Sequence, residues 1–113
     1  MSLIYKILPA TEWAAAEAAG VFTGSAVDLA DGYIHFSDAS QARETAAKWF
    51  VGQTGLLLVA FEAEALGSRL KWEPSRGGAL FPHLHAPLPA KLALWVRPLD
   101  LDEDGVPILG ELA

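Results

Sequence analysis

The chain has 113 residues, of which 52% are hydrophobic and 19% charged, and its formal net charge is −6. This apolar content supports a folded core and excludes a disordered chain, and the length predicts a single domain over residues 1–113. The acidic balance argues against nucleic-acid or anionic membrane partners. Cysteine is absent, which excludes disulfides and thiolate metal sites. Because no signal peptide or membrane-spanning run is recognisable, we expect a cytoplasmic protein.

The first part of the chain predicts one strand and one helix. Residues 3–8 alternate as a strand with one mostly apolar face, and Pro9 ends it. Thr11 is placed to cap an alanine-rich helix that stops at Gly20. Glycine and aspartate turn signals then predict irregular backbone over residues 21–32.

The next segment predicts a second strand and a second helix. Residues 33–37, YIHFS, are β-branched and aromatic, which is typical of a strand. Ser37 or Asp38 follows where a helix N-cap belongs, and the helical pattern runs through Phe50. Trp49 falls on the apolar side of this pattern, so we expect it in the core.

The remainder predicts more strands and one long loop. The continuous apolar run at 55–63 predicts a central strand covered on both faces. Residues 69–73 and 92–99 predict further strands. Residues 74–89 lack a period and predict an ordered loop, because irregular segments of this length in compact domains are commonly functional. The expected fold class is α+β, with a mixed or mostly antiparallel sheet and two main helices.

The predicted loop begins with a pattern suited to anions. Gly77 and the glycine after it permit positive φ and leave backbone N–H groups exposed to a ligand. The planar guanidinium group of Arg76 adds further hydrogen-bond donors. Together with Ser75 they form a candidate phosphate or carboxylate nest. A plain turn with an exposed arginine is the alternative.

Histidines and a glutamate are the candidates for chemistry. His83 and His85 project from one face if the backbone is extended. His35 lies on a predicted strand, and imidazole is the natural acid–base group near neutral pH. Glu73 at a strand end is placed to orient a substrate hydroxyl. The alternative interpretation is a set of structural hydrogen bonds and ion pairs.

Two further hypotheses use the same residues. His35, His83, His85 and Glu73 together would suit Zn, Fe or Mn. In a non-enzymatic protein, residues 82–89 would instead dock a partner, with Phe81 and Leu84 in an exposed patch.

Two long stretches resemble a known family. DGYIHFSDASQARETAAKWFVGQ and LKWEPSRGGALFPHLHAPLP are similar to the bacterial family catalogued as domain of unknown function 952, and the similarity extends from IYKI to LALWVRPL. The resemblance implies site residues at His35, Ser37, Trp72, Glu73, Ser75, Arg76, Gly77, Phe81, Pro82 and His83.

The family's fold resembles that of ADP-ribosyltransferases, which implies a split sheet around a nicotinamide dinucleotide cleft. Many members have a first strand similar to IYHIT, whereas this chain has Lys6 and Leu8 at those positions. Lys6 would then meet a phosphate as a point charge. His85 stands where the family pattern has tyrosine, and both side chains donate hydrogen bonds.

The combined expectation is a cleft for a small molecule or nucleotide, with NAD or a relative as the implied cofactor. His35, Glu73 and His83 are the catalytic candidates, and an ADP-ribosyltransferase-related enzyme is the implied activity. Trp72 and Phe81 would form apolar walls.

Overall fold

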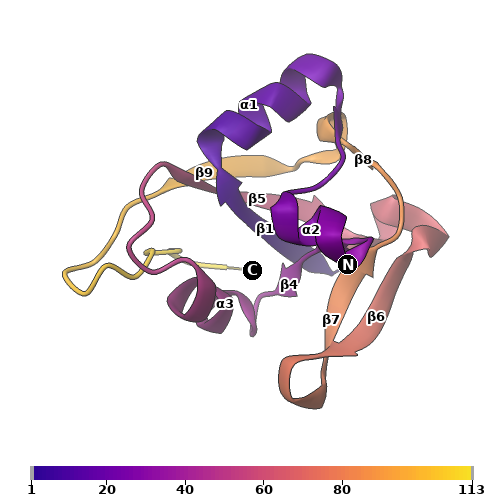
Figure 1. Ribbon diagram of the computed structural model, residues 1–113. Helices are drawn as coiled ribbons and strands as arrows, with labels where there is room; N and C mark the ends of the chain where they lie inside the picture. Colours follow the sequence, from indigo (N-terminus) through magenta and orange to yellow (C-terminus); the bar gives the residue numbers. More distant parts are fainter. Residues whose placement is uncertain (1, 113) are drawn as a thin grey trace.

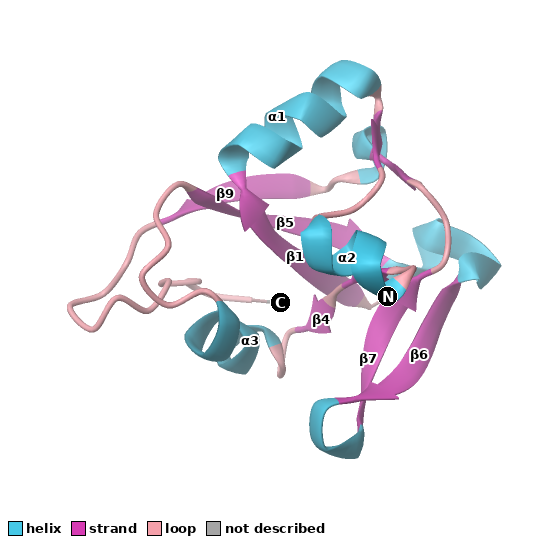
Figure 2. Ribbon diagram, in the orientation of Figure 1, coloured by secondary structure: helices cyan, strands magenta, loops and turns pink. Residues whose placement is uncertain are grey.

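The computed structural model describes residues 2–112 (Figures 1 and 2). Its strands are β1 Leu3–Pro9, β2 Val21–Phe22, β3 Ile34–His35, β4 Ser37–Asp38, β5 Leu56–Glu62, β6 Leu70–Ser75, β7 Ala79–Leu84, β8 Leu88–Pro89 and β9 Trp95–Leu99. Its helices are α1 Ala10–Ala19, α2 Ala26–Asp31 and α3 Ala42–Trp49, and 3-10 segments cover Ala63–Arg69, Arg76–Gly78 and Ala90–Leu92. No helix in the described range is both long and apolar enough to cross a membrane.

The described strands form separate antiparallel sheets. The larger sheet has the order β4-β1-β5-β9, the smaller has the order β3-β7-β6, and β2 pairs with β8. β1 pairs along its whole length with β5, from Leu3 opposite Glu62 to Pro9 opposite Leu56. The predicted mixture of helices with a mostly antiparallel sheet is therefore confirmed.

Side-chain alternation on β1 and β5 gives the larger sheet two buried faces. On one face, Ile4 and Phe61 pack in the same cluster as Trp13 of α1. On the other, Tyr5 and Leu58 pack with residues of α3. Figure 1 shows α1 and α3 on opposite sides of this sheet. The apolar run in β5 is covered on both faces, as its sequence predicts.

The prediction of a loop over residues 74–89 is wrong. This stretch completes β6, turns through a 3-10 segment and forms β7, so most of it belongs to a hairpin. Pro74 and Pro82 obscured the pattern, because proline lacks the N–H group that a strand ladder uses. Gly77, at φ 77°, makes the left-handed turn of the hairpin.

Residues 21–32 are also more regular than predicted, since they contain β2 and α2. Ser25 and Asp28 form a capping box at the start of α2, in which the Asp28 carboxylate accepts the Ser25 backbone N–H at 2.9 Å. Both residues are short and polar, and the spacing Ser-x-x-Asp was the available signal for this helix.

Three smaller predictions about helix ends and burial are also corrected. Thr11 lies inside α1, which begins at Ala10. Ser37 and Asp38 form β4 and do not cap α3, because β4 pairs with β1. Trp49, at the end of α3, is 55% exposed.

Candidate functional site

Four rings gather where β3 meets β7. His35 pairs directly with His83 across the two strands, so both side chains project from one face of the smaller sheet. The Tyr33 ring stacks on His83 at a centroid distance of 4.2 Å. It also lies 4.7 Å from the His35 ring and 5.2 Å from the His85 ring. The histidines therefore form one cluster around Tyr33.

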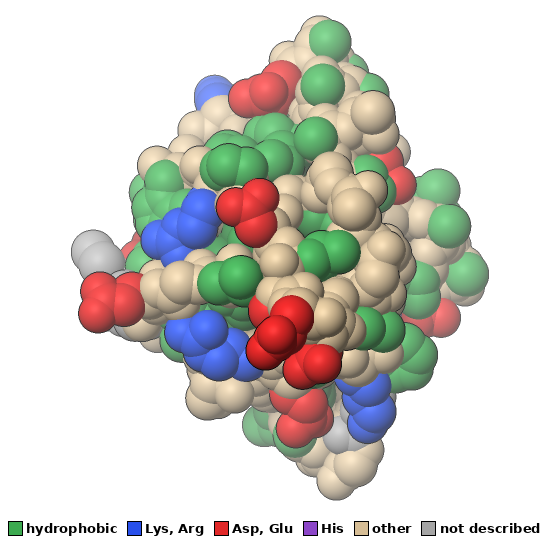
Figure 3. Space-filling view, turned by 90° about the vertical axis from the view of Figure 1, so that its left-hand side faces the viewer, with side chains coloured by type: hydrophobic (Ala, Val, Ile, Leu, Met, Phe, Trp, Pro, Cys, Tyr) green, Lys and Arg blue, Asp and Glu red, His purple; other side chains and the backbone are tan. Residues whose placement is uncertain are grey.

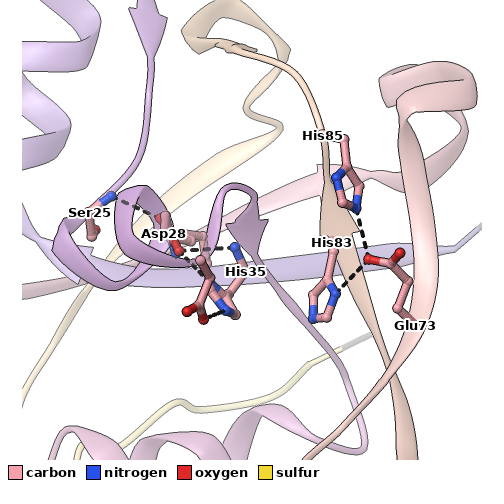
Figure 4. Close-up of polar contacts among 8 residues, drawn as sticks. Ser25, Asp28, His35, Glu73, His83 and His85 are labelled. Carbon is pink, nitrogen blue, oxygen red and sulfur yellow. Dashed lines mark hydrogen bonds and ion pairs between the residues drawn. The ribbon is translucent and has the colours of Figure 1, made fainter.

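Asp28 of α2 holds one side of this cluster (Figure 4). Its Oδ1 lies 2.6 Å from Nδ1 of His35 and accepts the His35 backbone N–H at 3.1 Å. Lys6 of β1 donates to both carboxylate oxygens, at 3.1 and 2.9 Å. Asp28 is 2% exposed and Lys6 is 6% exposed, so the ion pair is inside the protein.

The surroundings keep Asp28 ionised. Burial raises the pKa of its carboxyl, but the hydrogen bond from His35 and the charge of Lys6 outweigh burial and lower it to about 2. The second ring nitrogen of His35, Nε2, lies 2.9 Å from Oδ2 of Asp31. Both ring nitrogens of His35 thus face carboxylate oxygens.

Glu73 of β6 holds the other side of the cluster. Its Oε1 lies 2.9 Å from Nδ1 of His83 and 2.8 Å from Nε2 of His85 (Figure 4). Hydrogen bonds from His85 and His83 lower the pKa of the Glu73 carboxyl. Burial lowers the pKa of His83, which is 1% exposed, so its ring is neutral near pH 7.

A shallow hollow of about 280 Å³ opens beside the cluster. Tyr33 and His85 line it, together with Thr23, Gly32 and Pro87. The side chains of His35 and His85 are 27% and 31% exposed. The face shown in Figure 3 carries charged side chains of both signs, and no histidine is visible on it.

The structure brings together four of the predicted site residues, namely His35, Glu73, His83 and His85. The side chain of Arg76 lies outside the described part of the chain.

The other candidates lie elsewhere. The Ser37 hydroxyl lies 2.9 Å from the Thr45 hydroxyl. Trp72 points to the opposite face of β6 from Glu73, because neighbouring side chains of a strand alternate. Ser75 and Gly77 lie at the turn end of the hairpin, away from the hollow.

Two candidates are buried and do not line the hollow. The Lys6 ammonium binds Asp28 inside the protein, which contradicts its expected role as an open phosphate contact. Phe81 is 6% exposed and does not form a wall of the hollow.

Neither the hypothesis of a metal site nor that of an exposed docking patch fits this geometry. Within residues 2–112, no three His, Asp or Glu side chains are placed to hold a metal ion. The prediction that Phe81 and Leu84 lie in an exposed docking patch is also wrong, because they are buried, at 6% and 2% exposure.

Sequence reasoning missed Tyr33, Asp28 and Asp31. Tyr33 lies two residues before His35, and this spacing places both on one side of an extended segment. Asp28 was recognisable only through the capping box with Ser25. No sequence signal links Asp31 to His35 until α2 itself is recognised, after which their spacing of four residues becomes informative.

Gly24 is required for the placement of Asp28. Its φ is +127°, and a Cβ there would lie 2.9 Å from Cβ of Asp28, whereas a Cβ at Gly20, with φ +82°, would meet nothing within 4 Å. We expect Gly20→Ala to cost about 1 kcal/mol for the backbone conformation alone. Gly24→Ala should cost at least about 2 kcal/mol, since it adds a collision. Urea unfolding measures both, and equal losses would contradict the close approach.

Acid should weaken the fold through Asp28. Its pKa is about 2 in the folded chain against 3.8 as the ordinary value, so the unfolded chain takes up the proton first as pH falls. The stabilisation is complete above pH 4 and is lost between pH 4 and 2, a contribution of about 2 kcal/mol. Urea unfolding across this range should show a clearly larger loss in wild type than in the Lys6→Met/Asp28→Asn variant. Parallel pH profiles for the two proteins would contradict the assignment.

Known proteins are similar to this chain in sequence and fold. The family described as protein of unknown function DUF952 matches residues 7–96. The crystal structure of protein CC0527 from Caulobacter crescentus is 63% identical, with a TM-score of 0.94 over 96% of each chain. The solution NMR structure of CC0527 is 64% identical, with a TM-score of 0.88 over 97% of this chain and 95% of that chain. No curated protein matches. The chain belongs to the DUF952 family of proteins of unknown function.

Proposed function

We propose that this protein binds the nucleoside end of a nucleotide-like small molecule in the hollow beside Tyr33. The observation that carries the proposal is the gathering of three imidazoles around Tyr33, with Tyr33 and His85 lining that hollow. Clustered titratable groups beside a concave surface are typical of ligand sites. An aromatic ring also offers a stacking surface for a planar base.

The size and charge of the hollow favour a nucleoside over a phosphate. Its volume of about 280 Å³ lies at the lower end of small-molecule sites, enough for one part of a dinucleotide. Asp28 lines the hollow. Asp31 contacts the His35 ring, and Glu73 contacts the His85 ring. The partly exposed carboxylates of Asp31 and Glu73 accept hydrogen bonds from sugar hydroxyls, and the negative charge of all three carboxylates repels phosphate.

The proposal includes kinship with ADP-ribosyltransferases, whose ligands are NAD and ADP-ribose. The support is the resemblance of the DUF952 family's fold to theirs, together with an antiparallel fold divided into separate sheets. Lys6 does not contribute to this support, since its ammonium is held by Asp28. His35, with carboxylates at both ring nitrogens, is the acid–base candidate at the exposed edge of the site.

Calorimetric titration with adenosine, AMP, ADP-ribose and NAD tests the proposal. We expect binding by wild type, and at least about tenfold weaker binding by Tyr33→Leu because a stacking surface is lost. Trp72→Leu is the matched control and should bind like wild type, since Trp72 faces away from the site. Nicotinamide release from NAD would add a catalytic role. No binding of any of the four compounds by folded wild-type protein would overturn the proposal.

A further inference from the structure

His83 and His85 share one carboxylate oxygen but differ in what their remaining nitrogen can reach. Oε1 of Glu73 lies 2.9 Å from Nδ1 of His83 and 2.8 Å from Nε2 of His85. An ionised carboxylate only accepts hydrogen bonds, so each of these two ring nitrogens carries a proton. In a neutral imidazole the other nitrogen then has a bare lone pair, on Nε2 of His83 and on Nδ1 of His85.

The lone pair of His83 is closed to a ligand. Its Nε2 is buried and has no hydrogen-bond partner among residues 2–112. His83 is 1% exposed, and its ring stacks on the Tyr33 ring with the two centroids 4.2 Å apart. The sequence predicted His83 as a catalytic residue, but in this position it supports Tyr33 and Glu73 from beneath.

The lone pair of His85 is open. Its side chain is 31% exposed and the residue lines the hollow. Figure 4 shows its second ring nitrogen on the side away from Glu73. In the described range no hydrogen bond to that nitrogen is present, so a group from outside the protein can use it.

We propose that Nδ1 of His85 accepts a hydrogen bond from a ligand hydroxyl, and that Glu73 is the positioning residue that leaves this nitrogen unprotonated. The inference rests on the proposed ligand site and narrows its ligand to one that carries a free hydroxyl, such as the ribose of a nucleotide. A bare lone pair attracts an O–H group and repels the oxygen of a phosphate. His85, rather than His83, therefore determines specificity.

The first test needs no ligand. Long-range ¹H–¹⁵N NMR of the free protein at pH 8 reports which ring nitrogen carries the proton. We expect the proton on Nε2 in His85 and on Nδ1 in His83. Glu73→Gln should leave His85 as a mixture of both tautomers. A carboxylate can only accept hydrogen bonds, whereas the glutamine amide can accept from a protonated ring nitrogen or donate to an unprotonated one. A wild-type His85 ring protonated on Nδ1 would overturn the inference, whatever the protein binds.

The second test compares AMP with 2′,3′-dideoxy-AMP by calorimetry. Wild type should prefer AMP by at least about tenfold. His85→Phe should lose this preference, whereas His85→Asn should retain much of it, because the Asn carbonyl oxygen can stand near the place of Nδ1. Equal affinity of wild type for both compounds would overturn the inference and leave the proposed site in place. Failure to bind AMP, with adenosine, ADP-ribose and NAD also inactive, would overturn both.

Discussion

Asp28→Asn should destabilise the protein by about 3–5 kcal/mol, because it leaves the buried Lys6 ammonium without a counter-charge. The Lys6 side chain is 7% exposed and that of Asp28 is 1% exposed, so water cannot replace the lost partner. An amide also has only one acceptor atom, whereas Asp28 accepts from Lys6, His35 and Ser25 together. Urea unfolding followed by tryptophan fluorescence measures the change.

Asp31→Asn is the matched control for this experiment. Asp31 lies on the same helix and contacts the same histidine, but its side chain is 46% exposed. We expect a loss under about 1 kcal/mol, which is usual for exposed pairs. Adding Lys6→Met to Asp28→Asn should restore part of the stability, since the unpaired buried charge is then removed. Equal effects of Asp28→Asn and Asp31→Asn would show that the buried pair is not important for the fold.

Phe61→Ala should cost about 3–5 kcal/mol through the cavity it leaves in the core. Phe61 lies on β5, is fully buried, and meets the Trp13 ring edge-on at 6.1 Å and the Phe36 ring edge-on at 5.6 Å. It therefore joins α1 to the segment between β3 and β4. Thermal unfolding and urea unfolding both report the loss.

Val96→Ala provides the comparison on a neighbouring strand. Val96 lies on β9, pairs with Val59 of β5 and is 42% exposed. Because little apolar surface is uncovered, we expect a loss under about 1 kcal/mol. A loss for Phe61→Ala as small as that for Val96→Ala would contradict the description of the core.

The parts of the fold that follow from local pattern were predictable. β1 and β5 show strand alternation and a doubly covered apolar run, and both are present. The β6–β7 hairpin was missed because Pro82 sits in the middle strand of its sheet, a position that proline seldom takes. A long-range pairing with β3 fixes that strand, and no local rule contains such a pairing.

The candidate site was predictable in composition but only partly in geometry. His35, Glu73, His83 and His85 do lie together, because β3 and β6 both pair with β7. Their separate roles depend on burial, which sequence spacing does not contain. His83 is covered by Tyr33 while His85 reaches the hollow, although they are two residues apart on one strand. The pairing of Lys6 with Asp28 likewise requires α2 to lie over β1.

NMR titration of the wild-type protein with ADP-ribose tests the central claim, that Tyr33 and the histidines form one ligand site. The ring signals of Tyr33, His35 and His85 should shift together and give a single dissociation constant. The indole signals of Trp49 and Trp72, which are exposed on other surfaces, should not move. Shifts confined to the indoles, or ring signals that stay unchanged while ADP-ribose binds, would contradict it.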